Sequence, residues 1–269
     1  QGMPYYEKFV ASYPTVHALA AAEEQEVLKL WQGLGYYTRA RNLHATAKII
    51  VSEYSGVFPT SFAEIRKLKG VGDYTAAAIA SICFDLPHPV VDGNVIRFLS
   101  RLFGITDSTD LPETKREILS IAMQNIDHEC PGDFNQAMME FGAMQCTPAR
   151  PNCPLCPLKQ SCKAFKSCLV GEIPARSAKP STKHRFLHYL VITVTVNGED
   201  CICLNKRTTI DIWKNLYDFP CLEIKGEKKA RIAQKHEFVA ALNFDPPGPP
   251  EISDPVVHLL THQRLHIRF

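Results

Sequence analysis

Long apolar runs are missing from this sequence. No run reaches the length of a membrane span, and the N-terminus carries no basic segment followed by an apolar stretch and a cleavage site. We therefore expect a cytosolic or nuclear protein rather than a membrane-spanning or secreted one. Without an export signal, the ten cysteines indicate reduced thiols and metal ligands instead of a disulfide framework.

A strong charge of one sign is missing as well. Lys and Arg number 30 against 28 Asp and Glu, which gives a formal net charge of +2. A chain with this balance is not a generically basic nucleic-acid binder, so any such contact must be local. Internal repeats and low-complexity tracts are also absent.

The sequence has room for two cored domains, with 269 residues of which 45% are hydrophobic. Apolar residues recur at helical spacing up to about Gln145, and proline and glycine breaks divide this part into roughly eight or nine helices. Residues 170–183 are polar and proline-punctuated, which is typical of a linker. Beyond them we expect strands at 190–196, 201–204, 256–260 and 265–269 and a helix at 227–242. The prediction is an all-α domain over residues 1–169 and a smaller α+β domain over residues 184–269.

Four cysteines form a loop at 146–162 with the spacing C-x6-C-x2-C-x5-C: Cys146, Cys153, Cys156 and Cys162. Zinc fingers usually pair cysteines in two C-x2-C hooks, whereas only one such pair is present, so an iron–sulfur cluster is favoured. The alternative, four core thiols, conflicts with the prolines that interrupt the loop. Four basic residues and no acid make residues 147–169 a cationic patch.

A glycine-rich turn, Leu68–Thr75, joins two helical patterns. Gly70 and Gly72 let the backbone turn sharply and present N–H groups at the next helix, which can hold an anion, although such a turn is more often a simple connection. Asp73 is expected to cap that helix. Eighteen residues beyond Tyr74, Asp92 precedes another helical pattern, where a lone aspartate is most often only a cap.

Together, the hairpin, Asp92 and the four cysteines resemble the helix-hairpin-helix DNA glycosylases of the endonuclease III and MutY superfamily. Residues 33–43, 70–76 and 91–95 look like the MutY-type adenine glycosylases in particular, and the similarity runs over nearly the whole chain. The resemblance implies a [4Fe-4S] cluster on the four cysteines and removal of adenine mispaired with 8-oxoguanine or guanine in double-stranded DNA. The lyases of the superfamily carry a lysine where this chain has Tyr74, so no Schiff base can form there.

The resemblance also implies roles for single residues. Asp92 would stabilise the cationic sugar, Tyr74 would shape the site and Asn94 would orient water or substrate. Tyr36 would fill the space that the extruded base leaves, unless Tyr36 and Tyr37 are core aromatics. The implied DNA-binding positions are Leu34, Tyr36, Arg39, Gly70, Val71, Gly72, Thr261 and His262.

The second domain resembles the Nudix-like module with which MutY verifies 8-oxoguanine. Residues 213–220 look like its Trp-containing stretch, and Leu260-Thr261-His262 looks like its recognition loop. The glutamates of a Nudix metal box are missing after Gly226-Glu227, so we expect recognition rather than nucleotide hydrolysis.

Both ends of the sequence look cut, since there is no initiator Met and the last residues resemble an unfinished strand. The family comparison places the glutamate that protonates adenine upstream of Gln1. We therefore expect this chain by itself to excise adenine very slowly at best.

Two other functions stay open: an endonuclease III-like glycosylase and lyase acting on oxidised pyrimidines, and a non-catalytic DNA-binding iron–sulfur protein. A monomer is expected, associated with the nucleoid in a bacterium or located in the nucleus of a eukaryote. Contacts with replication or mismatch-repair proteins, and any redox role of the cluster, are not decided by the sequence.

Overall fold

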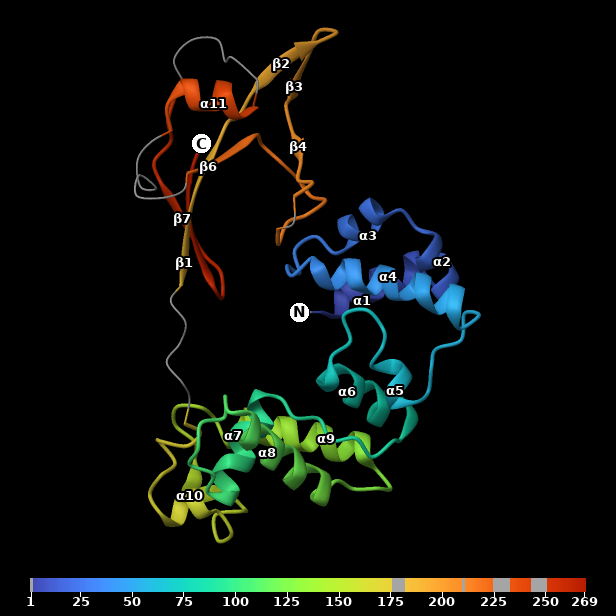
Figure 1. Ribbon diagram of the computed structural model, residues 1–269, viewed down its shortest axis with the longest axis vertical. Helices are drawn as coiled ribbons and strands as arrows, with labels where there is room; N and C mark the ends of the chain where they lie inside the picture. The colour runs from blue at the N-terminus through green and yellow to red at the C-terminus, as the bar shows by residue number, and fades with distance from the viewer. Residues whose placement is uncertain (1, 176–181, 210, 225–232, 243–250) are drawn as a thin grey trace. The chain divides into compact units, whose positions relative to one another are not determined.

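The computed structural model describes residues 2–175, 182–209, 211–224, 233–242 and 251–269. It divides the chain into two compact units, unit 1 (Gln1–Ala178) and unit 2 (Lys179–Phe269) (Figure 1). Over the described residues, no helix combines the length and apolar character that a membrane span needs.

Unit 1 is helical, as the apolar spacing predicts. Its elements are α1 (Met3–Ser12), α2 (Val16–Ala21), α3 (Glu24–Leu30), α4 (Thr38–Glu53), α5 (Phe62–Ile65), α6 (Asp73–Phe84), α7 (Gly93–Phe103), α8 (Pro112–Asn125), α9 (Pro131–Glu140), the π-helix η1 (Phe141–Gln145), the 3₁₀-helix η2 (Cys153–Leu155) and α10 (Lys163–Lys166). Helix α9 continues directly into η1, so the chain enters the cysteine loop from a π-helical turn. Such turns occur frequently at functional sites.

Helix α7 is the centre of the packing in unit 1. It contacts α8, α9, η1 and α10, and its apolar side is buried with residues of α8 in one core cluster, Val95, Phe98, Leu99, Ile105, Ile118 and Ala122. The helix ends at Gly104, whose φ of +69° is the left-handed conformation that glycine adopts without strain. Since α7 begins next to Asp92, this packing fixes the position of that carboxylate.

The first part of the expected linker 170–183 packs against unit 1. Ile173 is buried, its carbonyl accepts from Arg101 Nε at 2.8 Å, and the carbonyl of Ala175 accepts from Thr109 N at 3.1 Å. Residues 176–181 lie outside the described part. The helical unit therefore extends past Leu169.

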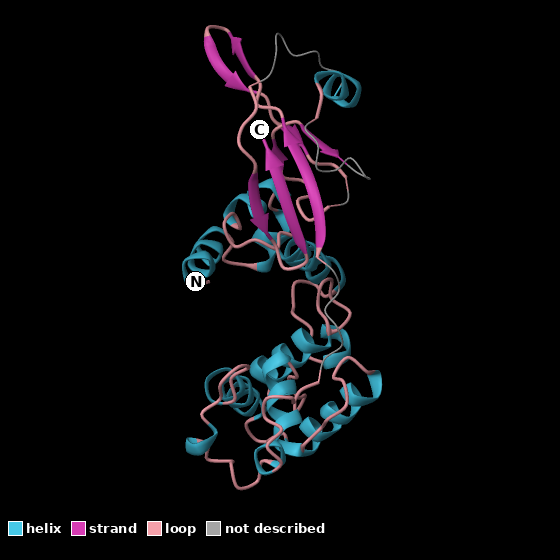
Figure 2. Ribbon diagram, turned by 90° about the vertical axis from the view of Figure 1, so that its left-hand side faces the viewer, coloured by secondary structure: helices cyan, strands magenta, loops and turns pink. Residues whose placement is uncertain are grey.

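Unit 2 contains a four-stranded sheet in the order β6-β1-β8-β7, with β1 and β8 parallel and the other neighbours antiparallel (Figure 2). The described elements are β1 (Lys183–Tyr189), β2 (Thr193–Val196), β3 (Glu199–Ile202), β4 (Asn205–Lys206), β5 (Tyr217–Asp218), β6 (Cys221–Ile224), α11 (Lys235–Leu242), β7 (Val256–Leu259) and β8 (Gln263–Arg268). Strands β2 and β3 form a separate hairpin, and β4 pairs with β5.

The two faces of the sheet carry different residues. Phe186, Leu222 and Ile224 pack with Phe238 of α11 on one face. Because side chains alternate along a strand, Arg185 and Leu187 of β1 point to the opposite face, together with their neighbours Glu223 and Leu265. The second face is thus the one on which a buried charge lies.

The α+β content of unit 2 agrees with the sequence, but the first predicted strand, 190–196, begins too early. Residues 190–192 are not in a strand, and β2 covers only Thr193–Val196. Strand β1 is not among the predicted strands: only Lys183 falls in the expected linker, and the polar start of the strand, Lys183, His184 and Arg185, does not indicate a buried strand. The expected helix 227–242 is described from Lys235, and Gly226-Glu227 lie outside the described residues.

Candidate active site and cysteine loop

Asp92 is the N-cap of α7. Its Oδ1 accepts from the backbone N–H groups of Asn94 and Val95, each at 2.8 Å, and its Oδ2 accepts from Asn94 Nδ2 at 3.0 Å. The carboxylate is half-buried. The capping role that the sequence suggested is confirmed, and it holds an anion at the positive end of a helix.

Tyr74 lies in the first turn of α6 and is 47% exposed. Its hydroxyl donates to the sulfur of Met139 on α9 at 3.8 Å. Asn94 also lies against this segment, because a Cβ added to Gly142 would come within 2.6 Å of the Asn94 carbonyl oxygen. Met139 and Gly142 are three residues apart, so α9 and η1 bring Tyr74 and the Asp92–Asn94 pair to the same part of unit 1.

Arg97 connects this site to the cysteine loop. The side chain is 5% exposed, and its Nη2 donates to Asn94 Oδ1 at 2.9 Å and to the carbonyl of Gly142. Its Nε donates to the carbonyl of Cys146 at 2.7 Å. One guanidinium therefore fixes the amide that contacts Asp92 and the backbone of the first loop cysteine.

The hairpin before α6 is a tight turn supported from α4. Gly70 has a φ of +80°, and a Cβ there would lie 2.4 Å from Asn42 Nδ2, so only glycine fits. Gly72 is the N-cap of α6, and the first N–H groups of that helix have no carbonyl acceptor within it. The prediction that Asp73 is the cap is wrong: Asp73 is the first helical residue, and its carboxylate pairs with Arg66.

Tyr36 lies in an exposed loop between α3 and α4. Gly33 and Gly35 have φ values of +102° and +69°, Tyr36 has +49°, and its side chain is 70% exposed. The alternative that Tyr36 is a core aromatic is therefore wrong. Leu34 is half-buried beside it, and the guanidinium of Arg39 lies 5.9 Å from the Trp31 ring centre.

The four cysteines Cys146, Cys153, Cys156 and Cys162 line one cavity of about 30 Å³, together with apolar side chains such as Phe98, Phe141 and Leu158. None of the four forms a disulfide bond. Burial, and then the charges of the other three cysteines, raise the pKa of the Cys153 thiol, so the sulfurs are electrostatic neighbours. Arg101 Nη1 donates to Cys146 Sγ at 3.4 Å and to the Thr147 carbonyl at 2.8 Å.

In unit 2, Thr261 and His262 form the exposed turn between β7 and β8. The turn is closed by a hydrogen bond from Leu260 N to the carbonyl of Gln263 at 2.8 Å, and the carbonyl of His262 accepts from Lys183 N at 3.1 Å. The backbone of the predicted recognition loop is therefore attached to both β1 and β8.

Three buried polar residues of unit 1 were not predicted as part of a site: Arg97, Arg101 and Asn135. The two arginines are four residues apart on an otherwise apolar side of α7, which is the pattern that could have revealed them. Asn135 is 1% exposed; its Oδ1 accepts from Val90 N, and its Nδ2 donates to His88 O and Ser81 Oγ, each at 2.9 Å. This amide therefore fixes the segment that leads into Asp92.

Comparison with known proteins agrees with this geometry. Residues 2–124 match the family described as HhH-GPD superfamily base excision DNA repair protein. An adenine DNA glycosylase of Buchnera aphidicola subsp. Baizongia pistaciae is 34% identical over 273 residues, which cover 98% of this chain and 72% of that protein.

Two solved structures share the helical fold, each covering 62% of this chain at 28% sequence identity. They are a thermostable thymine-DNA glycosylase, with a TM-score of 0.58 over 77% of that chain, and a non-covalent endonuclease III–DNA complex, with 0.53 over 76%. Since the names of these proteins give different activities, the fold alone does not determine which base is removed.

Proposed function

The chain belongs to the adenine DNA glycosylases, within the HhH-GPD superfamily of base excision DNA repair proteins, and we propose that it acts on adenine mispaired with 8-oxoguanine. The reaction is hydrolysis: the bond between C1′ of the deoxyribose and N9 of adenine breaks, and water adds to C1′. The observation that supports this assignment best is the capped carboxylate of Asp92, in the same part of unit 1 as Tyr74, which stands where a lyase would need an amine.

Asp92 supplies the electrostatic part of the mechanism. As the glycosidic bond breaks, the sugar becomes cationic, and an anion fixed beside it lowers the barrier. The three hydrogen bonds to Asp92 keep its charge in place before the reaction begins, so little reorganisation is needed. A carboxylate has about four lone-pair sites, so these bonds leave room for a contact with the sugar.

Tyr74 and Asn94 have supporting roles in this proposal. A phenol cannot form a Schiff base with C1′, which favours simple hydrolysis over strand cleavage. Asn94 joins Asp92 to Arg97 through the two ends of its amide and thereby orients the carboxylate. The proton on the departing adenine would come from an acid upstream of Pro4.

Binding of DNA would use three separate features. The N–H groups at the start of α6, presented by Gly70, Val71 and Gly72, would hold a phosphate. Tyr36, held out by the glycines beside it, would fill the gap left by the extruded nucleotide, which costs a few kcal/mol to create. The turn at Thr261 and His262 in the Nudix-like unit would contact 8-oxoguanine.

The four cysteines would hold a [4Fe-4S] cluster. Among the described residues, no three Cys, His, Asp or Glu side chains are arranged to hold a metal ion. Thiolates of an iron–sulfur cluster each bind a different iron and need not converge on one point, and here four cysteines without disulfide bonds line one apolar cavity. When bound, the cluster would crosslink the cationic loop, and Arg101 would donate to the Cys146 thiolate.

Single-turnover excision tests the proposal. The substrates are duplexes with adenine opposite 8-oxoguanine, guanine or thymine, and the enzyme is the chain extended upstream by the helix that would carry the general acid. We expect the fastest release of adenine opposite 8-oxoguanine and no borohydride-trapped adduct on abasic DNA. Trapping of a covalent adduct would favour a lyase, and DNA binding without release of any base would favour a non-catalytic protein.

A further inference from the structure

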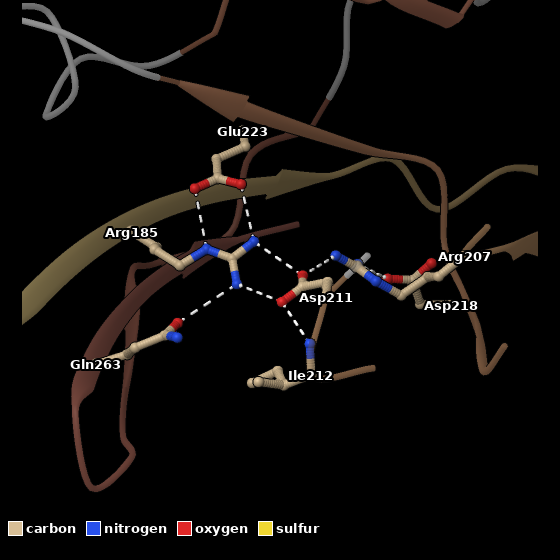
Figure 3. Close-up of polar contacts among 7 residues, drawn as sticks. All are labelled: Arg185, Arg207, Asp211, Ile212, Asp218, Glu223 and Gln263. Carbon is tan, nitrogen blue, oxygen red and sulfur yellow. Dashed lines mark hydrogen bonds and ion pairs between the residues drawn. The ribbon is translucent and has the colours of Figure 1, made fainter. Parts of the chain in front are cut away.

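A buried arginine lies in unit 2 at the base of the exposed turn. Arg185 on β1 is 7% exposed, and its five N–H groups all have acceptors (Figure 3). Its Nε and Nη2 donate to the two oxygens of Glu223 at 2.9 and 2.8 Å. Its Nη1 and Nη2 donate to the two oxygens of Asp211 at 3.2 and 3.1 Å, and Nη1 also donates to Gln263 Oε1 at 3.4 Å.

These acceptors come from three separate segments of the chain. Glu223 belongs to β6, Asp211 to the loop between β4 and β5, and Gln263 is the first residue of β8. The loop is held a second time by Arg207, which donates to Asp211 at 2.8 Å and pairs with Asp218. The Trp213 ring lies 5.9 Å from the Arg185 guanidinium and 5.2 Å from that of Arg207, measured to the ring centre.

Gln263 connects the hydrogen bonds of Arg185 to the turn between β7 and β8. It directly follows Thr261 and His262, and its carbonyl accepts from Leu260 N to close the turn. The backbone of Gln263 therefore sets the turn, while its side chain is fixed by Arg185. A change at Arg185 can therefore alter the turn that carries the exposed side chains of Thr261 and His262.

We propose that Arg185 is a positioning residue for recognition of the base opposite adenine, because it sets the orientation of the turn through Gln263. This inference rests on the proposed function of Thr261 and His262. Stability alone does not account for the arrangement, since buried ion pairs are often no more stabilising than apolar residues of the same size. A guanidinium whose five N–H groups all donate to fixed acceptors instead holds the segments that it joins in one relative orientation.

The test must distinguish loss of the positive charge of Arg185 from loss of its hydrogen-bond geometry. Arg185 and Arg207 face three carboxylates, those of Asp211, Asp218 and Glu223, so the network has one negative charge in excess. Removing Arg185 outright would also add repulsion toward DNA. Arg185→Lys keeps the charge but has three donors and no planar fork. Gln263→Ala leaves the ion pairs intact and removes only the side chain that joins Arg185 to the turn.

The assay measures binding to duplexes that carry 2′-fluoro-2′-deoxyadenosine, which resists hydrolysis, opposite either 8-oxoguanine or guanine at one salt concentration. The quantity of interest is the ratio of the two dissociation constants. We expect Arg185→Lys and Gln263→Ala each to lower the preference for 8-oxoguanine about threefold or more, as for loss of one or two hydrogen bonds. Affinity for the guanine duplex should stay within about twofold, since the charge at the surface is unchanged.

Arg268→Lys is the matched control, because it makes the same substitution at the far end of β8, where Arg268 Nη1 donates to Ser253 O at 3.1 Å. It should leave the ratio unchanged. If Thr261→Ala lowers the ratio but Arg185→Lys and Gln263→Ala do not, the positioning role is refuted while the proposed function stands. If the unaltered protein shows no preference, the proposed function fails and this inference fails with it. If circular dichroism shows that Arg185→Lys unfolds unit 2, Gln263→Ala decides.

Discussion

Replacing Arg97 by methionine should uncouple the cysteine loop from the active site. The variant removes three hydrogen bonds from one buried guanidinium, to Asn94 Oδ1, Gly142 O and Cys146 O. Each buried acceptor left without a hydrogen bond lowers the stability by about 1–3 kcal/mol, and part of this is recovered because a charged group is no longer buried. We expect a loss of about 2–4 kcal/mol in the free energy of unfolding.

The loss should appear in two measurements. Urea denaturation of the cluster-loaded protein gives the change in stability, and single-turnover excision by the upstream-extended protein gives the change in the chemical step. We expect slower excision under conditions in which Arg97→Met is still folded, because Asn94 then no longer holds the Asp92 carboxylate. Both the stability and the excision rate of Arg97→Lys should lie between those of the unaltered protein and Arg97→Met, since an ammonium can keep some of the hydrogen bonds but not all. Unchanged stability together with an unchanged excision rate would refute the coupling.

Three further results are expected. Asn135→Leu should lower the free energy of unfolding by about 2–4 kcal/mol, because Val90 N and the His88 carbonyl lose a buried partner; urea denaturation measures this, and a change below about 0.5 kcal/mol would contradict it. Burial lowers the pKa of His88, so below about pH 6.5 the unfolded chain binds more protons and stability should fall as the pH falls. His88→Phe, which keeps the stacking on Phe62, should weaken this dependence in thermal denaturation, and an identical pH profile would count against it. Cys156→Ala should abolish the bound iron and visible absorbance of the cluster, and retention of four irons per chain would exclude the proposed ligand set.

Much of the site could be predicted because its signals are local in the sequence. The glycine turn, the cap at Asp92 and the cysteine spacing each depend on a few neighbouring residues, and the structure has the turn and the cap where they were expected. The exposure of Tyr36 followed in the same way from the two glycines that flank Leu34. Local backbone requirements of this kind can be read without knowing what packs against them.

The residues that were missed depend on distant partners. Strand β1 begins with Lys183, His184 and Arg185, which do not look like a buried strand, and Arg185 is buried only because its acceptors come from distant segments. Asn135 was missed for the same reason, whereas the spacing of Arg97 and Arg101 along α7 is a local signal that could have indicated them. Asp73 was assigned as a cap because its type fits, but Gly72 occupies that position and Arg66 takes the carboxylate.

The measurement that tests the central claim most directly is single-turnover excision by Asp92→Asn, made in the same upstream-extended protein. Asparagine caps a helix as well as aspartate does, so the hydrogen bonds from Asn94 N and Val95 N should survive, while the negative charge and the bond from Asn94 Nδ2 to Asp92 Oδ2 are lost. We predict an excision rate lower by about 10²-fold or more, while the variant stays folded and keeps its affinity for the 2′-fluoro duplex. Excision at the normal rate by this variant would contradict the claim that a fixed anion at position 92 stabilises the cationic sugar.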